Sequence, residues 1–170
     1  SYRSNPLKLA SFALSRRDPD YVPRARATQA LEEARRSGAM PPELQSVQKA
    51  LSIPDMSRVQ IGSVLFANKP GDGSAREQAA SCQKVLGGFA NICYEFATKR
   101  YRSNCINCGI LPFTLDAGTS FDYAPGDCVF VPGIRQAIEN GIEDIPARVI
   151  RTDGAVEGLM LHVKGLTDDE

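Results

Sequence analysis

One short segment of the chain combines glycines, a hydroxyl and a guanidinium group in an order suited to binding an anion. Residues 71–78 are GDGSAREQ. Two glycines let a backbone turn sharply and approach a ligand closely, and a helix that begins here would offer free N–H groups and a partial positive charge. Arg76 can grip a carboxylate with two parallel hydrogen bonds, and Ser74 places a hydroxyl beside it. The segment predicts an anion-binding turn. The alternative is an ordinary capped strand–helix junction, and a Walker loop is excluded because Gly-Lys-Ser/Thr is missing.

The elements that must hold this turn alternate between strands and helices. The apolar run 59–67 is typical of a buried strand. Ser74, with Glu77 three residues later, has the spacing of a capping box, which predicts a helix from residue 75 to about residue 86. Further strands are predicted at 89–96, 127–132, 147–151 and 159–163, and further helices at 97–104 and 134–140. This alternation predicts an α/β fold.

The first 50 residues follow a different, polar and helical pattern. Good helix formers fill residues 27–37, and Gly38 with the proline pair 41–42 ends that helix. A second short helix is predicted at 42–51. We expect residues 25–58 to be a helical elaboration on the surface of a single domain that spans residues 1–170.

The composition narrows the class of protein. A length of 170 residues suits one domain. The 20 Lys and Arg residues balance the 20 Asp and Glu residues, which argues against a dedicated nucleic-acid binder. A hydrophobic content of 42% argues against disorder. Five cysteines without a visible export signal favour reduced thiols and a cytoplasmic location.

Three motifs, in order, resemble the C-terminal swivel domain of the aconitase superfamily. Residues 71–80 are similar to the family's Gly-x-Gly-Ser-Ser-Arg-Glu-His-Ala segment. Residues 96–104 contain Phe-Ala and Arg-Ser-Asn and resemble its Ser-Phe-Ala-Arg-Ile-His-x-x-Asn stretch, and residues 109–113 resemble its Gly-Ile-Leu-Pro-Leu. With weaker similarity near both ends, the resemblance covers roughly residues 1–24 and 59–168. It implies a three-layer β/β/α swivel domain whose small barrel-like mixed sheet is flanked by helices.

The resemblance also implies a role in a hydro-lyase that acts on hydroxy-polycarboxylates. In this family a 4Fe–4S cluster polarises the substrate hydroxyl, a serine takes a proton, and arginines hold the carboxylates. Carried over, Ser74 would be the general base, Arg76 and Arg3 would bind substrate carboxylates, and Gly73 and Ala75 would contact the substrate. The cysteines that bind the cluster belong to another domain or subunit. We therefore expect this chain to bind no metal, to be inactive alone, and to partner cluster-bearing aconitase domains.

Several departures from the family pattern leave alternatives open. Ala75 replaces the second serine of the motif, Gln78 replaces its histidine, and residues 98–100 (Thr-Lys-Arg) replace its Arg-Ile-His. We favour a fragment of a longer, divergent aconitase-like hydratase. The alternatives are the small subunit of an isopropylmalate-isomerase-type dehydratase and a non-catalytic ligand-binding swivel domain.

The cysteines and the one histidine offer other chemistry. Cys105 and Cys108 form a Cys-x2-Cys pair, but a four-cysteine zinc site needs a second such pair, and the sequence has none at suitable spacing. We expect all five cysteines to fill the core rather than to form a metal or redox module. His162 lies in an apolar run and is expected to be structural. The arginine-rich N-terminal region keeps RNA binding as a remaining alternative.

Overall fold

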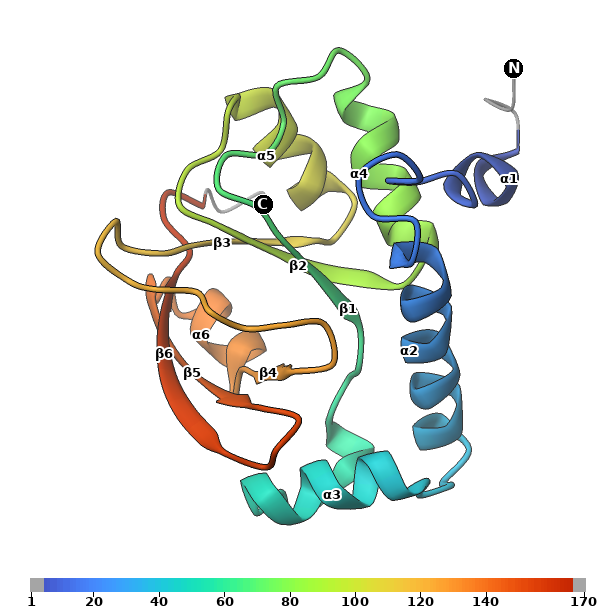
Figure 1. Cartoon of the computed structure of the whole chain (residues 1–170). Coiled ribbons are helices and arrows are strands. Elements are labelled where there is room, and N and C mark those ends of the chain that lie inside the picture. Colours follow the sequence, from blue (N-terminus) through green and yellow to red (C-terminus); the bar gives the residue numbers. More distant parts are fainter. Residues whose placement is uncertain (1–4, 167–170) are drawn as a thin grey trace.

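A curled mixed sheet forms the centre of the protein, and helices surround it (Figure 1). The computed structural model describes residues 5–166. Within them, six strands lie in the order β1-β2-β3-β6-β5-β4. The strands are β1 Ser63–Phe66, β2 Gly88–Cys93, β3 Leu111–Thr114, β4 Cys128–Phe130, β5 Asp144–Ile150 and β6 Val156–His162. The helices are α1 Pro6–Ala10, α2 Tyr21–Arg36, α3 Pro42–Leu51, the 3₁₀ turn Met56–Arg58, α4 Arg76–Val85, α5 Lys99–Asn107 and α6 Ile134–Glu139.

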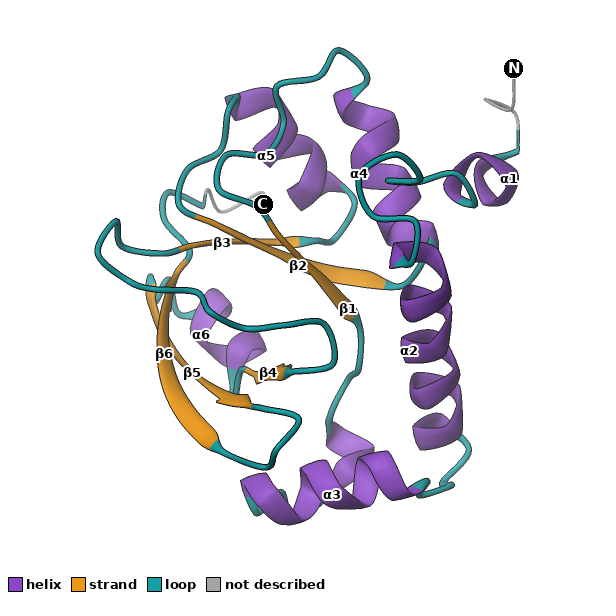
Figure 2. Cartoon of the chain, viewed as in Figure 1, coloured by secondary structure: helices purple, strands orange, loops and turns teal. Residues whose placement is uncertain are grey.

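The first half of the sheet is parallel. β1 pairs with β2 and β2 pairs with β3, and α4 and α5 make the two crossovers. Figure 2 shows both helices on the same side of these strands. Parallel strands need such crossovers, because the end of one strand and the start of the next lie at opposite edges of the sheet. Since α4 and α5 both start from the carboxyl edge of this half, their first residues lie close together.

The second half is an antiparallel hairpin, β5 and β6, with the short strand β4 at its edge. Along β5 the residues alternate between exposed and buried, as expected for a strand with one face in the core. Both halves bury side chains in one cluster, which includes Ile92 and Phe113 from the parallel half and Val149 and Leu161 from the hairpin. The sheet therefore curls around a single core, and α6 packs against that core through Ile134 and Ala137.

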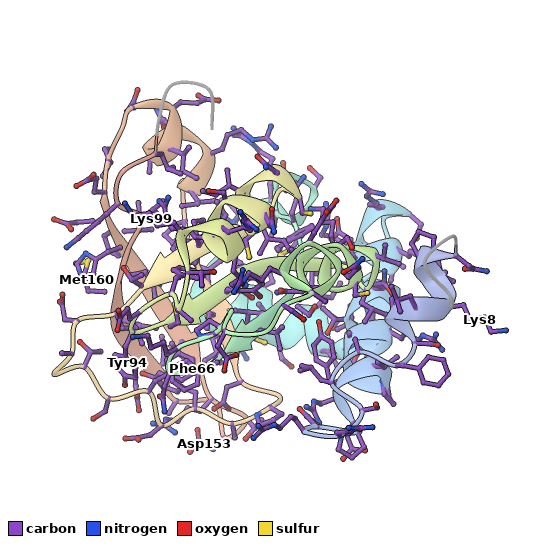
Figure 3. The ribbon with its side chains drawn as sticks, turned by 90° about the horizontal axis from the view of Figure 1, so that it is seen from above. Lys8, Phe66, Tyr94, Lys99, Asp153 and Met160 are labelled. Atoms are coloured by element: carbon purple, nitrogen blue, oxygen red, sulfur yellow. The ribbon has the colours of Figure 1, made fainter. Side chains whose placement is uncertain are left out.

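An aromatic group fixes the loop between β3 and β4 across the carboxyl ends of the parallel strands. Phe66 ends β1 and stacks on Phe121 of this loop, with ring centroids 4.1 Å apart. Tyr94 follows β2, meets Phe66 edge-to-face, and donates its hydroxyl hydrogen to the carbonyl oxygen of Thr119 (2.6 Å). Figure 3 shows Phe66 and Tyr94 side by side, with Met160 at the outer surface.

The N-terminal helices share hydrophobic contacts with the sheet layer. Leu44 and Leu51 of α3 form a cluster with Ile150 of β5. Arg148 on the same strand donates a hydrogen bond from Nη2 to the carbonyl oxygen of Leu51 (3.3 Å). Ala25 of α2 belongs to a second cluster, to which α4 contributes Cys82. The segment expected to be a helical elaboration is therefore packed on both α4 and the antiparallel hairpin.

Most elements lie where the sequence predicts them. α3 has the predicted bounds, and α2 begins six residues earlier than predicted. β1 is shorter than the apolar run 59–67, because residues 59–62 lead out of a 3₁₀ turn and do not pair in the sheet. The predicted α/β class is confirmed. Within residues 5–166, no helix is both long and apolar enough to cross a membrane.

The two halves of the sheet meet at one residue pair, Thr114 and His162. His162 is 8% exposed. Its Nδ1 lies 2.8 Å from Asp144 Oδ1 of β5, and its Nε2 lies 3.1 Å from Asp116 Oδ2, just beyond β3. Burial alone would lower the pKa of His162, but the two carboxylates outweigh it and the pKa is raised above its ordinary value. His162 was predicted to be structural or at the surface, and the structural reading agrees with its position between a carboxylate of each half.

We predict that the free energy of unfolding decreases as pH rises above neutrality. A raised folded-state pKa means that the stabilisation is complete below the unfolded-state pKa of about 6.5 and is lost as pH rises through the folded-state value. Urea unfolding at about pH 6 and about pH 8 measures this, and comparison with a His162 variant cancels the contribution of the cysteines, which both proteins share. At the lower pH the His162→Asn variant should be less stable than the wild-type protein. Between the lower and the higher pH, its free energy of unfolding should decrease less than that of the wild-type protein. Equal losses for both proteins would contradict the assignment.

Candidate functional site

The predicted anion-binding turn opens into a cavity between α4 and α5. Its volume is about 390 Å³, which is within the range of small-molecule sites, roughly 300–1,000 Å³. The turn and α4 contribute residues 74–78, and α5 contributes Arg100 and Asn104. The two helices are held together by a buried cluster that includes Ala80 of α4 and Cys105 of α5. The position of one wall relative to the other is therefore set by packing in the interior.

Gly71 is the point at which the turn touches α5. Its φ of +99° lies in the region that favours glycine. A Cβ at this position would lie 2.6 Å from the side chain of Tyr101, so the ring takes the space a larger residue would need. The carbonyl oxygen of Gly71 accepts two hydrogen bonds, from Arg76 Nε (3.2 Å) and from Thr98 Oγ1 (3.2 Å). This one peptide thus orients the guanidinium of Arg76 and links it to the start of α5.

Tyr101 is held in turn by polar side chains that lie beneath the cavity. Asn91 of β2 donates from Nδ2 to the Tyr101 hydroxyl (3.0 Å) and to Cys105 Sγ (3.3 Å). Gln83 of α4 donates from Nε2 to Asn91 Oδ1 (2.7 Å). Burial, followed by the nearby Cys105, raises the pKa of Tyr101, so its hydroxyl is un-ionised at neutral pH. The network joins α4, β2 and α5 directly behind the turn.

The predicted capping box is wrong. α4 begins at Arg76, and the N-cap residue is Ala75, whose carbonyl oxygen accepts from Ala79 N (3.0 Å). Ser74 lies one residue too early to cap the helix, and Ala75 has no side-chain acceptor. The first amide groups of α4 therefore lack a side-chain cap. Ser74 is exposed, and its hydroxyl makes no hydrogen bond with any described residue.

The structure places four of the five predicted site residues at or next to this cavity. Ser74, Ala75 and Arg76 line it, and Gly73 precedes them in an open position. Arg3 lies outside the described residues.

Three residues of α5 and its N-cap were not predicted as site residues. Arg100 and Asn104 line the cavity one helical turn apart, and Thr98 caps α5 by accepting from Tyr101 N (3.2 Å). Arg100 and Thr98 both lie in the triplet where the sequence departs from the family pattern, and Asn104 lies one residue beyond the position of that motif's asparagine. These features of the sequence could have marked α5 as part of the site. Only the packing of α5 against α4, however, shows that Arg100 and Asn104 line the same cavity as the turn.

The cysteines have the properties of structural thiols, with one exception. Cys82, Cys93 and Cys105 are buried, and Cys108 is half-buried. Burial raises the pKa of Cys93 to about 12 and also raises the pKa values of Cys105 and Cys108, which disfavours the thiolate needed for metal binding. Core packing was wrongly predicted for Cys128, which is exposed at the sheet edge. Across residues 5–166, no group of three or more His, Cys, Asp or Glu side chains could hold a metal ion.

A curled mixed sheet flanked by helices, with a glycine-containing turn before α4, is the architecture predicted for a swivel-type α/β domain. Residues 38–118 match the sequence model of the family described as Aconitase C-terminal domain. This part of the chain, 81 of its 170 residues, is thus similar to the aconitase family, as the motifs indicated, and it includes every residue that lines the cavity. It starts at residue 38, so it also takes in part of the segment 25–58 that no motif had covered.

Two relatives agree with this family assignment. Aconitate hydratase A of Bradyrhizobium diazoefficiens is 41% identical over 119 residues, which are 65% of this chain and 12% of that protein. The 3-isopropylmalate dehydratase small subunit of Metallosphaera sedula is 37% identical over 103 residues, which are 60% of this chain and 59% of that protein. The matched region therefore spans only part of each relative, and both belong to hydro-lyase families.

We predict that Gly71→Ala destabilises the protein by roughly 1–3 kcal/mol, because it adds a methyl group against Tyr101 and forces a positive φ on alanine. Gly73→Ala is the matched control, since a Cβ there meets nothing within 4 Å. Urea unfolding of both variants measures the difference. A Gly71→Ala variant as stable as Gly73→Ala would show that the turn does not depend on this contact.

Proposed function

We propose that the chain is the carboxylate-binding and general-base domain of an aconitase-like iron–sulfur hydro-lyase that acts on a hydroxy-polycarboxylate. The observation that carries this proposal is the position of Ser74 and Arg76 together in one cavity, within the segment that matches the family. The names of both relatives, a hydratase and a dehydratase, support the reaction class.

In this proposal Arg76 binds one substrate carboxylate. Its Nε is engaged with Gly71, which leaves the two terminal nitrogens free to form a bidentate pair. Ser74 Oγ removes the proton from the carbon beside that carboxylate. A serine hydroxyl ionises far above neutral pH, so it needs positive potential nearby. Arg76, Arg100 and the uncapped amides of α4 supply this potential.

The cluster is proposed to be bound by another domain or subunit. The buried cysteines and the absence of a metal-ligating group among the described residues do not fit a cluster site within this chain. When bound elsewhere, the cluster would supply a Lewis acid for the substrate hydroxyl. The residues described here would position the substrate and move the proton.

Two arrangements of the whole protein remain as proposals. We favour a longer single chain, because the weaker similarity at residues 1–24 resembles the start of this domain in bacterial aconitases. The alternative is a small subunit that pairs with a cluster-bearing large subunit. The match to 59% of the isopropylmalate dehydratase small subunit supports this alternative. The coding sequence on both sides of residues 1–170 distinguishes the two.

We predict that Ser74→Ala, in the full-length protein with its cluster, lowers kcat for hydration of aconitate or a related acid by about 10²-fold or more, because proton removal loses its base. Arg76→Lys should instead raise KM by about tenfold, since lysine cannot form the bidentate pair. Steady-state kinetics with each acid measures both values.

Ser81→Ala is the matched control, because Ser81 lies on the same helix and does not line the cavity. Unchanged turnover in Ser74→Ala would refute the assignment of the base. If the wild-type protein binds these acids but does not turn them over, the chain is instead a non-catalytic ligand-binding domain.

A further inference from the structure

Arg100 is a cation in the cavity to which the motif pattern assigns no role. It lies in the first turn of α5, where the family pattern has a histidine, and it is exposed. Its guanidinium makes no hydrogen bond or ion pair with any residue in the described part of the chain. A guanidinium is always charged and carries five donors, so all five are available to a ligand.

The placement of Arg100 follows from the packing of α5. Tyr101 and Cys105 face the interior and are 5% and 0% exposed. Their N-terminal neighbours, Arg100 and Asn104, therefore share an adjacent face of the helix at i and i+4. This face forms the wall of the cavity opposite the turn that carries Arg76. Figure 1 shows that α4 and α5 both begin at the same end of the molecule, so the two arginines enter the cavity from separate helices.

The remaining lining groups indicate what kind of ligand fits between the two arginines. Glu77 forms no ion pair with Arg76 or Arg100 among residues 5–166, so neither cation is neutralised by a direct contact. A carboxylate accepts hydrogen bonds from hydroxyl groups, and amides donate and accept them. Glu77 can thus accept a hydrogen bond from a ligand hydroxyl, and Gln78 can bind a hydroxyl or a carbonyl oxygen, while the two guanidinium groups each take an anionic group.

We propose that Arg100 is a specificity-determining residue that binds a second carboxylate, so that the cavity selects ligands with at least two carboxylates and discriminates against monocarboxylates. Asn104 lies beside Arg100 and donates a hydrogen bond to the same carboxylate. The proposal rests on the proposed function for its ligand chemistry, but it concerns a different residue and a different end of the ligand.

The test is a titration of the 170-residue chain, followed by two-dimensional NMR of the backbone amides. The probes are tricarballylate, which has three carboxylates and no hydroxyl, and butyrate, which has one carboxylate. In Arg100→Gln, the affinity for tricarballylate should decrease about five- to tenfold, the range expected for an exposed charge-assisted contact. The affinity for butyrate should change by less than about twofold, because butyrate needs only the Arg76 subsite.

Lys99→Gln is the matched control. Lys99 precedes Arg100 on α5, carries the same charge and does not line the cavity. Its loss should leave both affinities near the wild-type values. Arg100→Lys should recover only part of the tricarballylate affinity, because the charge remains but the planar fork is lost.

The possible results separate this inference from the proposed function. If Arg76→Gln abolishes binding of both probes while Arg100→Gln changes neither, the carboxylate site stands and the role of Arg100 is refuted. An equal loss in Lys99→Gln and Arg100→Gln would also refute it, since the effect would be one of net charge. Selective loss in Arg100→Gln supports the inference even where Ser74→Ala leaves turnover of the full-length protein unchanged. A wild-type chain that binds neither probe overturns both proposals.

Discussion

The contact between the Cα of Gly71 and the ring of Tyr101 determines where both walls of the cavity lie. Glycine is required because φ is +99° and the ring occupies the space of a Cβ. The same peptide accepts hydrogen bonds from Arg76 and Thr98, so a single carbonyl joins the turn, α4 and the start of α5. Behind it, Asn91 and Gln83 hold Tyr101 in place. A polar network that is fully buried fixes geometry more strictly than an apolar contact does, because any displacement leaves donors unpaired.

The departures from the family pattern are located in the parts of the structure that shape this cavity. Ala75 is the N-cap of α4 and has no side-chain acceptor, so the first amides of that helix have no side-chain cap. The family's arginine at position 98 is replaced by threonine, which caps α5 and binds Gly71. A cation appears instead at Arg100, two positions further along. Lys99 and Arg100 both place positive charge in the exposed first turn of α5, and of these two residues only Arg100 lines the cavity.

The sequence predicts the class of fold because that class depends on local patterns. The bounds of α3 follow from Pro42 at its start and from apolar spacing within it, whereas α5 was predicted at 97–104 and lies at Lys99–Asn107. The capping box at Ser74 was wrong because α4 begins at Arg76 with Ala75 as its N-cap, which the local spacing of residues did not show. Arg100 was missed for the same reason. Helical spacing tells which residues share a face, but tertiary packing decides what that face meets.

The packing of α3 on β5 has a consequence for the order in which the chain folds. Leu44 and Leu51 find their partner Ile150 only after about 100 further residues have been made. At synthesis rates of about 5–20 residues per second, this is a delay of roughly 5–20 s. During that time the apolar side of α3 can pack only on nearby members of its cluster, such as Ile53 and Met56. The strands β5 and β6, in contrast, can pair as soon as they appear because they are adjacent in sequence. The early helices are therefore the part of the nascent chain that is exposed to aggregation for longest.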